Sequence, residues 1–161
     1  MKENISLSIV VPVFNEENTI LEILKKLNIL KKTCKIEIIL VNDGSTDGSK
    51  TIIDENSRLY SQCIHLDKNS GKGRAVIEGL KLCKMNYIII QDADLEYDPN
   101  DIIIFLEELE KFRFDLIMGS RFIGTKRSVL NFWHMLGNKF ITFLFNFINN
   151  TTFTDIYCCY C

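Results

Sequence analysis

The chain has little of what marks unfolded, fibrous or membrane-spanning proteins. Its 161 residues include two prolines and eight glycines, and 47% are apolar, which excludes disordered, collagen-like and low-complexity classes. No stretch of about 18 uninterrupted apolar residues occurs, so the sequence predicts no membrane span. The apolar run Ile9–Phe14 is too short for a secretory signal and polar residues follow it at once, so a cytoplasmic location is expected.

Paired cysteine motifs are also absent. Cys34, Cys63 and Cys83 stand alone among apolar neighbours, a pattern typical of buried, reduced thiols in a cytoplasmic protein. Three more cysteines lie within residues 158–161, but their spacing does not match a zinc knuckle and no histidine is close in the sequence. A chain of this length buries enough surface to fold without disulfides or a structural metal, so a single domain over residues 1–161 is expected.

The chain also lacks a large excess of charge of either sign, since 19 basic and 21 acidic side chains give a formal net charge of −2. Its distribution is uneven, because residues 120–161 carry four basic side chains against one acidic side chain. This basic end contains an apolar, phenylalanine-rich segment over residues 129–150. Two explanations stay open for that segment: it lies in a membrane interface, or it forms a helix that packs on the sheet.

Apolar, β-branched runs predict strands that are buried on both faces, as in a parallel sheet. These runs are Ser6–Val13, Ile36–Val41, Tyr87–Ile90 and Asp115–Met118, with a weaker strand around Cys63–Leu66. Apolar residues at helical spacing lie between them, over residues 20–30, 75–83 and 102–109. The alternation predicts an α/β sandwich built around a mainly parallel sheet.

Polar loops follow the strands, at the sheet edge where ligands of open parallel sheets bind. The loops are residues 12–17, 42–49, 69–74 and 91–96. Glycines in the second loop permit a tight turn, and Ser45, Thr46 or Asp47 can cap the helix that follows it. The four loops are therefore expected to converge on one cleft.

The acidic triplet Asp92-Ala93-Asp94 directly follows the strand Tyr87–Ile90 and its Gln91. Two carboxylates at a strand end, with Glu96 close behind, can ligate a hard divalent cation and leave positions open for phosphate oxygens. An EF-hand is excluded, because Tyr97 would occupy its glycine position. The sequence contains neither a Walker A motif nor a G-x-G-x-x-G fingerprint, so nucleoside-diphosphate chemistry on a metal is favoured.

Five motifs, in order along the chain, resemble those of the family 2 glycosyltransferases. They are Val10–Glu17, Val41–Asp47, Asn69–Gly73, Asp92–Asp94 and Gly119–Phe122. The likeness is greatest to the dolichyl-phosphate mannose synthase type, the polyprenyl-phosphate glycosyltransferases, and it continues through residues 131–138 to residues 154–155. The resemblance implies a GT-A-type, Rossmann-like α/β/α fold that binds a nucleotide sugar.

The resemblance also implies roles for the residues of the first two loops. Pro12, Phe14 and Glu16 match the family's contacts to the nucleoside of the donor. Phe14 stands where tyrosine is common, so a hydroxyl contact is lost. Asp43 matches the acidic residue that binds the base or the ribose, and the often acidic position before it is Asn42 in this chain.

The family's metal and diphosphate motif, known as DXD, is matched by Asp92, Ala93 and Asp94. The ligands of Mg²⁺ or Mn²⁺ that the resemblance implies are Asp92, Asp94 and Glu96. Arg121 matches an arginine that meets a phosphate of the donor or the acceptor, a role suited to its planar fork of donors. Lys72 is a second candidate for the same phosphates, although a solvated lysine fits the sequence equally well.

The implied reaction is an inverting transfer of a sugar from a donor like GDP-mannose or UDP-glucose. Asp94 and Arg121 are the expected catalytic residues, because help to the departing diphosphate is the main catalytic contribution. An acceptor phosphate is already ionised and needs no general base, and the sequence offers no obvious base. A polyprenyl (dolichyl-type) phosphate at the cytoplasmic membrane face is therefore favoured, with peripheral membrane association and no nucleic-acid partner.

Relatives of this type continue beyond residues 154–155, so the chain is expected to be incomplete at its C-terminal end. Two alternatives stay open beside a polyprenyl-phosphate enzyme. One is a family 2 glycosyltransferase that acts on a glycan hydroxyl, and the other is a nucleotide-sugar-binding fragment without catalysis.

Overall fold

The computed structural model describes residues 5–112, 116–120 and 132–156. The chain divides into two compact units, an N-terminal unit of residues 1–114 and a C-terminal unit of residues 115–161. A single domain over the whole chain stays a prediction.

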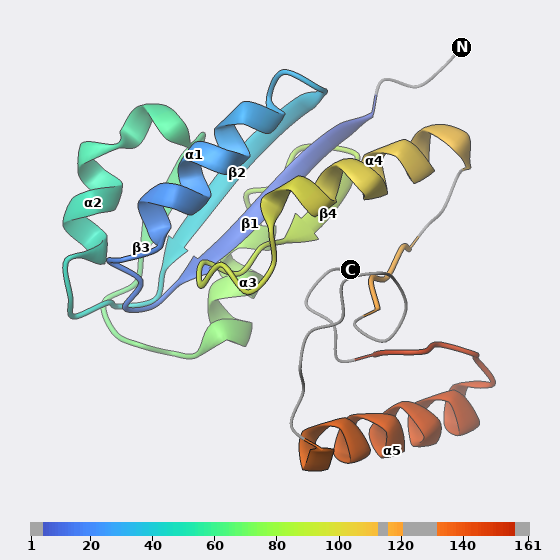
Figure 1. Ribbon diagram of the computed structural model, residues 1–161. Helices are drawn as coiled ribbons and strands as arrows, with labels where there is room; N and C mark the ends of the chain where they lie inside the picture. Colours follow the sequence, from blue (N-terminus) through green and yellow to red (C-terminus); the bar gives the residue numbers. More distant parts are fainter. Residues whose placement is uncertain (1–4, 113–115, 121–131, 157–161) are drawn as a thin grey trace. The chain divides into compact units, whose positions relative to one another are not determined.

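The N-terminal unit is built on a parallel sheet of four strands in the order β3-β2-β1-β4 (Figure 1). Val13 at the end of β1 pairs with Asn42 at the end of β2, so these two strands finish level with each other. The parallel sheet predicted from the apolar runs is confirmed. The strands are β1 (Ser6–Val13), β2 (Lys35–Asn42), β3 (Gln62–His65) and β4 (Tyr87–Ile90).

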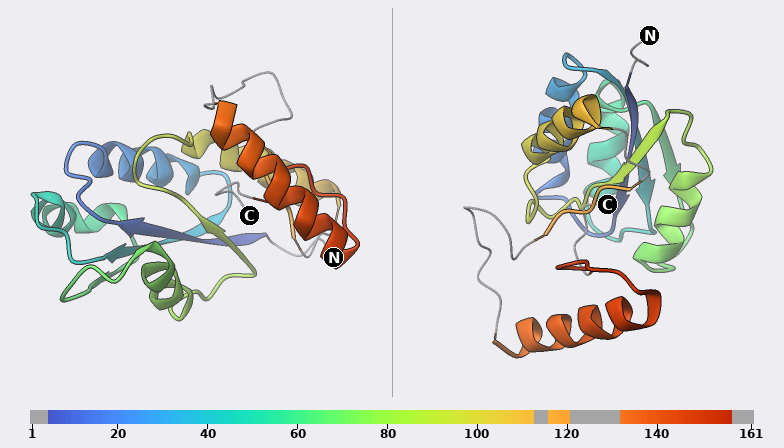
Figure 2. Two further views of the ribbon diagram at one scale, coloured as in Figure 1. Left: turned by 90° about the horizontal axis from the view of Figure 1, so that it is seen from below. Right: turned by 90° about the vertical axis from the view of Figure 1, so that its right-hand side faces the viewer.

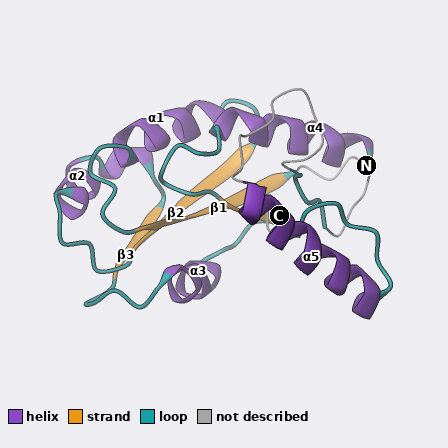
Figure 3. Ribbon diagram, turned by 60° about the horizontal axis from the view of Figure 1, so that its bottom comes forward, coloured by secondary structure: helices purple, strands orange, loops and turns teal. Residues whose placement is uncertain are grey.

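Helices cover both faces of this sheet. Helices α1 and α4 lie on one face and α3 on the other (Figures 2 and 3), with α2 packed beside α1, so the predicted α/β/α sandwich is confirmed. The helices are α1 (Ile20–Leu30), α2 (Ser49–Glu55), α3 (Lys72–Leu80) and α4 (Ile102–Lys111), with short 3₁₀ turns at Ser57–Leu59 and Pro99–Asp101.

The core lies between β1, β2 and α1. All eight residues of β1 are buried, which explains why this strand is an unbroken apolar and β-branched run rather than an alternating one. On α1 the buried side chains recur at helical spacing, at residues 20, 23, 24, 27 and 30. Burial of each such leucine or isoleucine contributes roughly 1.5–3 kcal/mol. This core fixes the strand ends on which the polar loops stand.

Three expectations about the N-terminal unit and its border need correction. The predicted strand Asp115–Met118 is wrong, because residues 116–118 form no ladder and Leu116 is 58% exposed. Strand β4 is not buried on both faces, because Ile88 is 43% exposed. The helix expected over residues 75–83 starts at Lys72 and ends at Leu80. An apolar run forms a strand only where its backbone groups make hydrogen bonds to a neighbouring strand and its side chains are buried.

The isolated cysteines also differ from expectation. Cys34, Cys63 and Cys83 are free, as predicted, but each is half-buried rather than buried. Burial is still sufficient to raise the pKa of all three thiols, in the case of Cys63 to about 12. These thiols are therefore weak nucleophiles at neutral pH.

The C-terminal unit contains α5 (Phe132–Asn149) and the segment that follows it. A polar stripe on α5 holds that segment: Asn138 Nδ2 donates to Asp155 Oδ1 at 3.1 Å, and Asn146 pairs with the backbone of Phe153. Most large apolar side chains of α5 are exposed, including Trp133 and Phe147. Of the helices that the structure describes, none has both the length and the apolar character needed to cross a bilayer.

Candidate functional site

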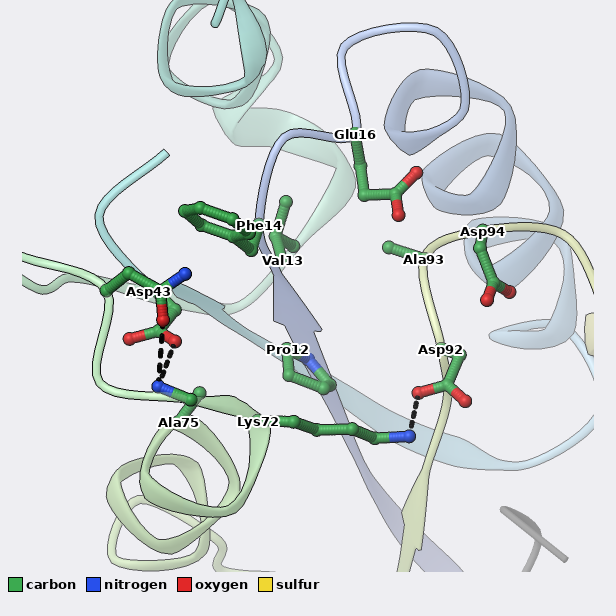
Figure 4. Close-up of a pocket in the computed structure, with 12 residues that line it drawn as sticks. Pro12, Val13, Phe14, Glu16, Asp43, Lys72, Ala75, Asp92, Ala93 and Asp94 are labelled. Atoms are coloured by element: carbon green, nitrogen blue, oxygen red, sulfur yellow. Dashed lines mark hydrogen bonds and ion pairs between the residues drawn. The ribbon is translucent and has the colours of Figure 1, made fainter. Parts of the chain in front are cut away.

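A pocket of about 290 Å³ opens at the carboxyl ends of β1, β2 and β4 (Figure 4). Strand β1 lies between β2 and β4, while the chain runs from β1 outward to β3 before it returns to β4. The strand order therefore reverses beside β1, which is where ligands bind in open α/β sheets. The convergence of the polar loops on one cleft is borne out by this pocket.

Eight residues that the sequence singled out line this pocket. They come from three strand ends and from the start of α3: Pro12, Phe14, Glu16, Asp43, Lys72, Asp92, Ala93 and Asp94. Glu96 lies in the same loop as Asp94 but is exposed and does not line the pocket. Arg121 lies outside the described residues. The roles given to all these side chains remain predictions.

Side chains tie the loop after β1 to the loop after β2. The Asn15 N–H donates to Ser45 Oγ at 3.0 Å, and the Glu16 N–H donates to Ser49 Oγ at 2.7 Å. Asn15 has a φ of 57°, a left-handed conformation that asparagine tolerates better than most residues. Since Asn15 stands between Phe14 and Glu16, these bonds set the wall of the pocket.

Asp47 strengthens the same junction. One of its carboxylate oxygens accepts the Ser49 N–H at the start of α2, and the other accepts the Glu17 N–H. Burial alone would raise the pKa of this carboxyl, but hydrogen bonds from Ser49 and Glu17 outweigh it and hold the pKa below the usual range. The prediction that Ser45, Thr46 or Asp47 is the cap of the next helix is wrong, because Gly48 is the N-cap of α2 and makes no side-chain cap bond; Asp47 instead binds the first N–H of the helix from one residue further out.

Asp43 organises the opposite wall. Its buried carboxylate accepts the N–H of Ser70 at 2.9 Å and the N–H of Gly71 at 2.8 Å, so it anchors the loop that leads into α3. Gly44 beside it has a φ of 66°, and a Cβ there would come within 2.5 Å of the Lys68 backbone. The glycine is therefore required by a close approach of two loops as well as by its dihedral angle.

Lys72 and Asp92 form an ion pair across the floor of the pocket. The Lys72 Nζ lies 2.6 Å from Asp92 Oδ1, and the Asp92 side chain is 13% exposed. Asp94 is exposed, and its carboxylate accepts the N–H of Glu96 at 3.0 Å, which curves the loop. Figure 4 shows the carboxylates of Asp92 and Asp94 one after the other along this loop.

The described lining of the pocket carries excess negative charge. Of the residues that the structure describes, Glu16, Asp43, Asp92 and Asp94 contribute four carboxylates to this lining and Lys72 contributes one ammonium group. The described residues gather no cluster of three or more histidine, cysteine or acidic ligands. Mg²⁺ is usually held by one or two carboxylates together with substrate phosphates, so the hard oxygen donors of Asp92 and Asp94 fit such a cation without a third ligand.

Gln91 is a residue of the site that the sequence did not single out by role. It is fully buried, and its Nε2 donates to the carbonyl oxygens of Asp92 and Tyr97, at 3.0 and 3.1 Å. These two bonds hold both ends of the loop that carries Asp94. A polar side chain at the end of a buried strand was the available signal, because buried amides need partners.

Known proteins resemble this chain along most of its length. The profile described as Glycosyl transferase family 2 matches residues 8–161. An undecaprenyl-phosphate 4-deoxy-4-formamido-L-arabinose transferase of Pseudomonas fluorescens is 35% identical over 68% of this chain and 34% of its own. A dodecaprenyl-phosphate galacturonate synthase of Rhizobium johnstonii is 33% identical over 74% of this chain and 37% of its own. The chain thus spans about a third of these relatives.

Solved structures share the fold. Residues 1–349 of Staphylococcus aureus TarS, in complex with UDP-GlcNAc, superpose with a TM-score of 0.53 and 27% identity over 65% of this chain and 32% of that one. A Pyrobaculum calidifontis mannosyltransferase in complex with GDP-Man and Mn²⁺ gives a TM-score of 0.51 and 25% identity over 60% and 30% of the two chains. The GT-A type of fold and the likeness to polyprenyl-phosphate enzymes are confirmed. The chain belongs to glycosyltransferase family 2.

Proposed function

We propose that the pocket binds a nucleoside-diphosphate sugar and that the protein transfers the sugar, with inversion, to a polyprenyl phosphate. One observation carries the proposal: residues from four separate loops, chosen from the sequence for donor chemistry, line one pocket. The names of the two bacterial relatives, both of which specify a polyprenyl phosphate, support the acceptor. The donor is proposed to resemble GDP-mannose or UDP-glucose.

Different residues of the chain would contact the nucleoside and the diphosphate of the donor. Phe14, which is 41% exposed at the mouth of the pocket, offers an aromatic face to the nucleoside. Each carboxylate oxygen of Asp43 accepts one backbone N–H group. The remaining lone pairs can accept hydrogen bonds from a base or a ribose. Pro12 and Glu16 complete this half of the pocket.

The diphosphate half is proposed to need a divalent cation. A diphosphate would meet a pocket with four carboxylates and one ammonium group, and that balance repels an anion. Asp92 and Asp94 would hold Mg²⁺ or Mn²⁺, with Glu96 as a further proposed ligand, and the bound ion would offset charge on the departing diphosphate. The complex of the Pyrobaculum mannosyltransferase with Mn²⁺ supports this choice of ion.

In the proposed transfer, an oxygen of the acceptor phosphate bonds to the anomeric carbon. The bond from that carbon to the diphosphate breaks on the opposite face, and its electron pair leaves with the diphosphate. Lys72 contributes positive charge on the diphosphate side, and Arg121 is proposed to do the same. An ionised phosphate needs no proton removed, so no general base is required.

Peripheral contact with the cytoplasmic membrane face belongs to the same proposal. Helix α5 exposes large apolar side chains, among them Trp133, Phe143 and Phe147, and its described charged residue is Lys139. Aromatic side chains of this kind suit the boundary between lipid head groups and acyl chains. A lipid acceptor would be presented at that boundary.

Calorimetric titration of the chain tests the donor half of the proposal. GDP-mannose, UDP-glucose, GDP and UDP are each titrated with Mn²⁺ and with EDTA. We expect one nucleotide to bind more tightly than the other and binding to require Mn²⁺. An absence of binding to all four compounds would contradict the donor site.

A transfer assay with radiolabelled donor and a lipid extract tests the acceptor half. Label in the organic phase supports a polyprenyl phosphate, and label in a water-soluble glycan supports the hydroxyl-acceptor alternative. Because the chain spans about a third of its relatives, a chain that binds donor without transfer would behave as a nucleotide-sugar-binding fragment.

A further inference from the structure

A chain of hydrogen bonds runs from the wall of the pocket to the surface of α2. The Ser45 N–H donates to Asn42 Oδ1 at 3.0 Å, and Asn42 Nδ2 lies 3.0 Å from His65 Nδ1. His65 Nε2 lies 3.0 Å from Asp54 Oδ1, a half-exposed carboxylate. The four residues joined by these hydrogen bonds, Ser45, Asn42, His65 and Asp54, do not line the pocket themselves.

The donors and acceptors in this chain fit together in one direction only. A backbone N–H can only donate, so the Asn42 atom that faces Ser45 must be the oxygen, and the amide nitrogen then faces His65. That nitrogen is a donor, so His65 Nδ1 must accept and carry no proton. The ring proton therefore sits on Nε2 and is donated to Asp54.

At its Ser45 end, the series of hydrogen bonds reaches the pocket through Asn15. Ser45 Oγ accepts the N–H of Asn15, and Asn15 Oδ1 accepts the N–H of Thr46, so the Ser45 turn and Asn15 hold each other. Asn15 stands between two lining residues, and Asn42 directly precedes a third, Asp43. Displacement of the Asn42 amide would therefore loosen both walls.

We propose that His65 is a positioning residue of the nucleotide pocket. As the neutral Nε2–H tautomer it holds the Asn42 amide in the orientation that accepts the Ser45 N–H, and a second proton on Nδ1 releases that turn. An imidazolium Nδ1–H would face the Asn42 NH₂, donor against donor, so the ring must move away or the amide must flip and abandon Ser45. The inference rests on the proposed nucleotide function.

Polar groups of two other elements face the two ring nitrogens of His65. Asp54 from α2 lies at Nε2, and Asn42 from β2 lies at Nδ1. Cys63 on its own strand lies 3.6 Å from Nε2, and burial raises the pKa of that thiol to about 12, so it stays neutral. The pKa of Tyr60 is raised by burial and by its neighbours Cys63 and Asp54, so the phenol is neutral as well. Among these described neighbours, Asp54 is thus the carboxylate.

Nuclear magnetic resonance tests the hydrogen-bond chain without any nucleotide. The sequence has two histidines, so ¹⁵N-labelled imidazole signals are assigned with a His134→Asn variant. At pH 7.5 we expect His65 as the Nε2–H tautomer, and on acidification to pH 5.5 the amide signal of Ser45 should move together with the His65 signal. An Nδ1–H tautomer, or a Ser45 amide that stays constant while His65 takes up its proton, would overturn the proposal.

Two variants separate positioning from mere structural support. His65→Asn supplies an acceptor that cannot take up a proton, and Asn42→Asp supplies a carboxylate that accepts from both Ser45 and an imidazolium. Affinity for the tighter of GDP and UDP is measured at pH 7.5 and pH 5.5. Protonation of the diphosphate weakens binding to every variant alike, so the losses are compared between variants, and His134→Asn controls for removal of a histidine elsewhere. Between pH 7.5 and pH 5.5 we expect affinity to fall at least fivefold more in the unsubstituted chain and in His134→Asn than in His65→Asn and Asn42→Asp.

Equal pH dependence in all four proteins would refute the role of His65. If no nucleotide binds at either pH, the proposed donor function fails. The tautomer and the Ser45 amide signal then still decide whether His65 controls the turn.

Discussion

Asp94 is the single residue on which the proposed metal dependence most directly depends. Its exposed carboxylate lines the pocket and accepts the N–H of Glu96. We expect Asp94→Asn to weaken Mn²⁺-dependent nucleotide binding at least tenfold, because an amide cannot supply the charge that a hard divalent ion prefers. Calorimetry with and without EDTA measures the effect.

The matched control for that change is Asp67→Asn. Asp67 is exposed and does not line the pocket, so its substitution should leave affinity within twofold. Unchanged Mn²⁺-dependent affinity in Asp94→Asn would remove Asp94 from the proposed metal site.

Lys72 is a cationic side chain that lines the pocket, and it pairs with Asp92. If Lys72 contributes charge to the donor phosphates, Lys72→Met should weaken GDP or UDP binding about tenfold, the equivalent of about 1.4 kcal/mol. Affinity for the corresponding nucleoside, which has no phosphate, should change little. The comparison is made by calorimetry in the presence of Mn²⁺.

Lys81→Met is the control, because Lys81 lies just beyond the same helix and pairs with Glu78, away from the pocket. An increase in affinity on removal of Lys72 would show instead that this lysine competes with the divalent ion for Asp92.

Helix α3 is the element that brings Lys72 into the pocket, and it packs closely on the sheet at Gly79. A Cβ at Gly79 would come within 2.5 Å of Val10 Cγ1 and 3.2 Å of Val41 Cγ2, both in the core. We expect Gly79→Ala to lower the free energy of unfolding by about 1–3 kcal/mol, because the fully buried valines have little room to move. Urea denaturation measures the change.

Gly73→Ala on the same helix is the matched control. A Cβ at Gly73 meets nothing within 4 Å, so this change should leave stability unaltered or raise it by up to about 1 kcal/mol. Equal effects of the two substitutions would contradict close packing of α3 on the sheet.

For the whole molecule, the half-buried thiols predict a loss of stability in mild alkali. The folded pKa of Cys63 is about 12 because burial disfavours the thiolate, whereas an unfolded thiol titrates near 8.5–9. A raised folded pKa gives stability that is complete below the unfolded pKa and is lost as the pH rises above it. We therefore expect the free energy of unfolding to fall between pH 8 and pH 10.

Urea denaturation at several pH values in that range tests this expectation. Cys63→Ala should flatten the pH dependence more than Cys34→Ala, because the pKa of Cys34 is raised less far. An identical slope in the unsubstituted chain and in Cys63→Ala would exclude this thiol as the cause.

Much of the fold was accessible from the sequence because its signals are local. Strand β1 and helix α1 begin and end where the apolar patterns predict, since each pattern reports burial by its own period. The predicted strand Asp115–Met118 failed for the opposite reason: its pattern says nothing about a ladder partner, and residues 116–118 have none.

The candidate site follows the same division. Eight residues predicted from loops after strands line one pocket, because parallel strands present their carboxyl ends at a single sheet edge. The sequence did not reveal the roles of Gln91 and His65, because these depend on their hydrogen-bond partners. Gln91 binds Tyr97, 6 positions away, and His65 binds Asn42, 23 positions away on the neighbouring strand. No spacing in a sequence reports such pairings.

By itself, then, the sequence determined the four strands of the sheet and the helices α1, α3 and α4, the loops that carry polar side chains and the membership in glycosyltransferase family 2. Each of these depends on residue type and on spacing along the chain. The tertiary structure alone decided that Lys72 pairs with Asp92 and that Asp43 anchors the entrance to α3. It also decided that Asn42 links the pocket wall to His65. These contacts join residues brought together by the crossing of strands and helices, and hydrogen bonds depend on distance in space rather than on position in the chain.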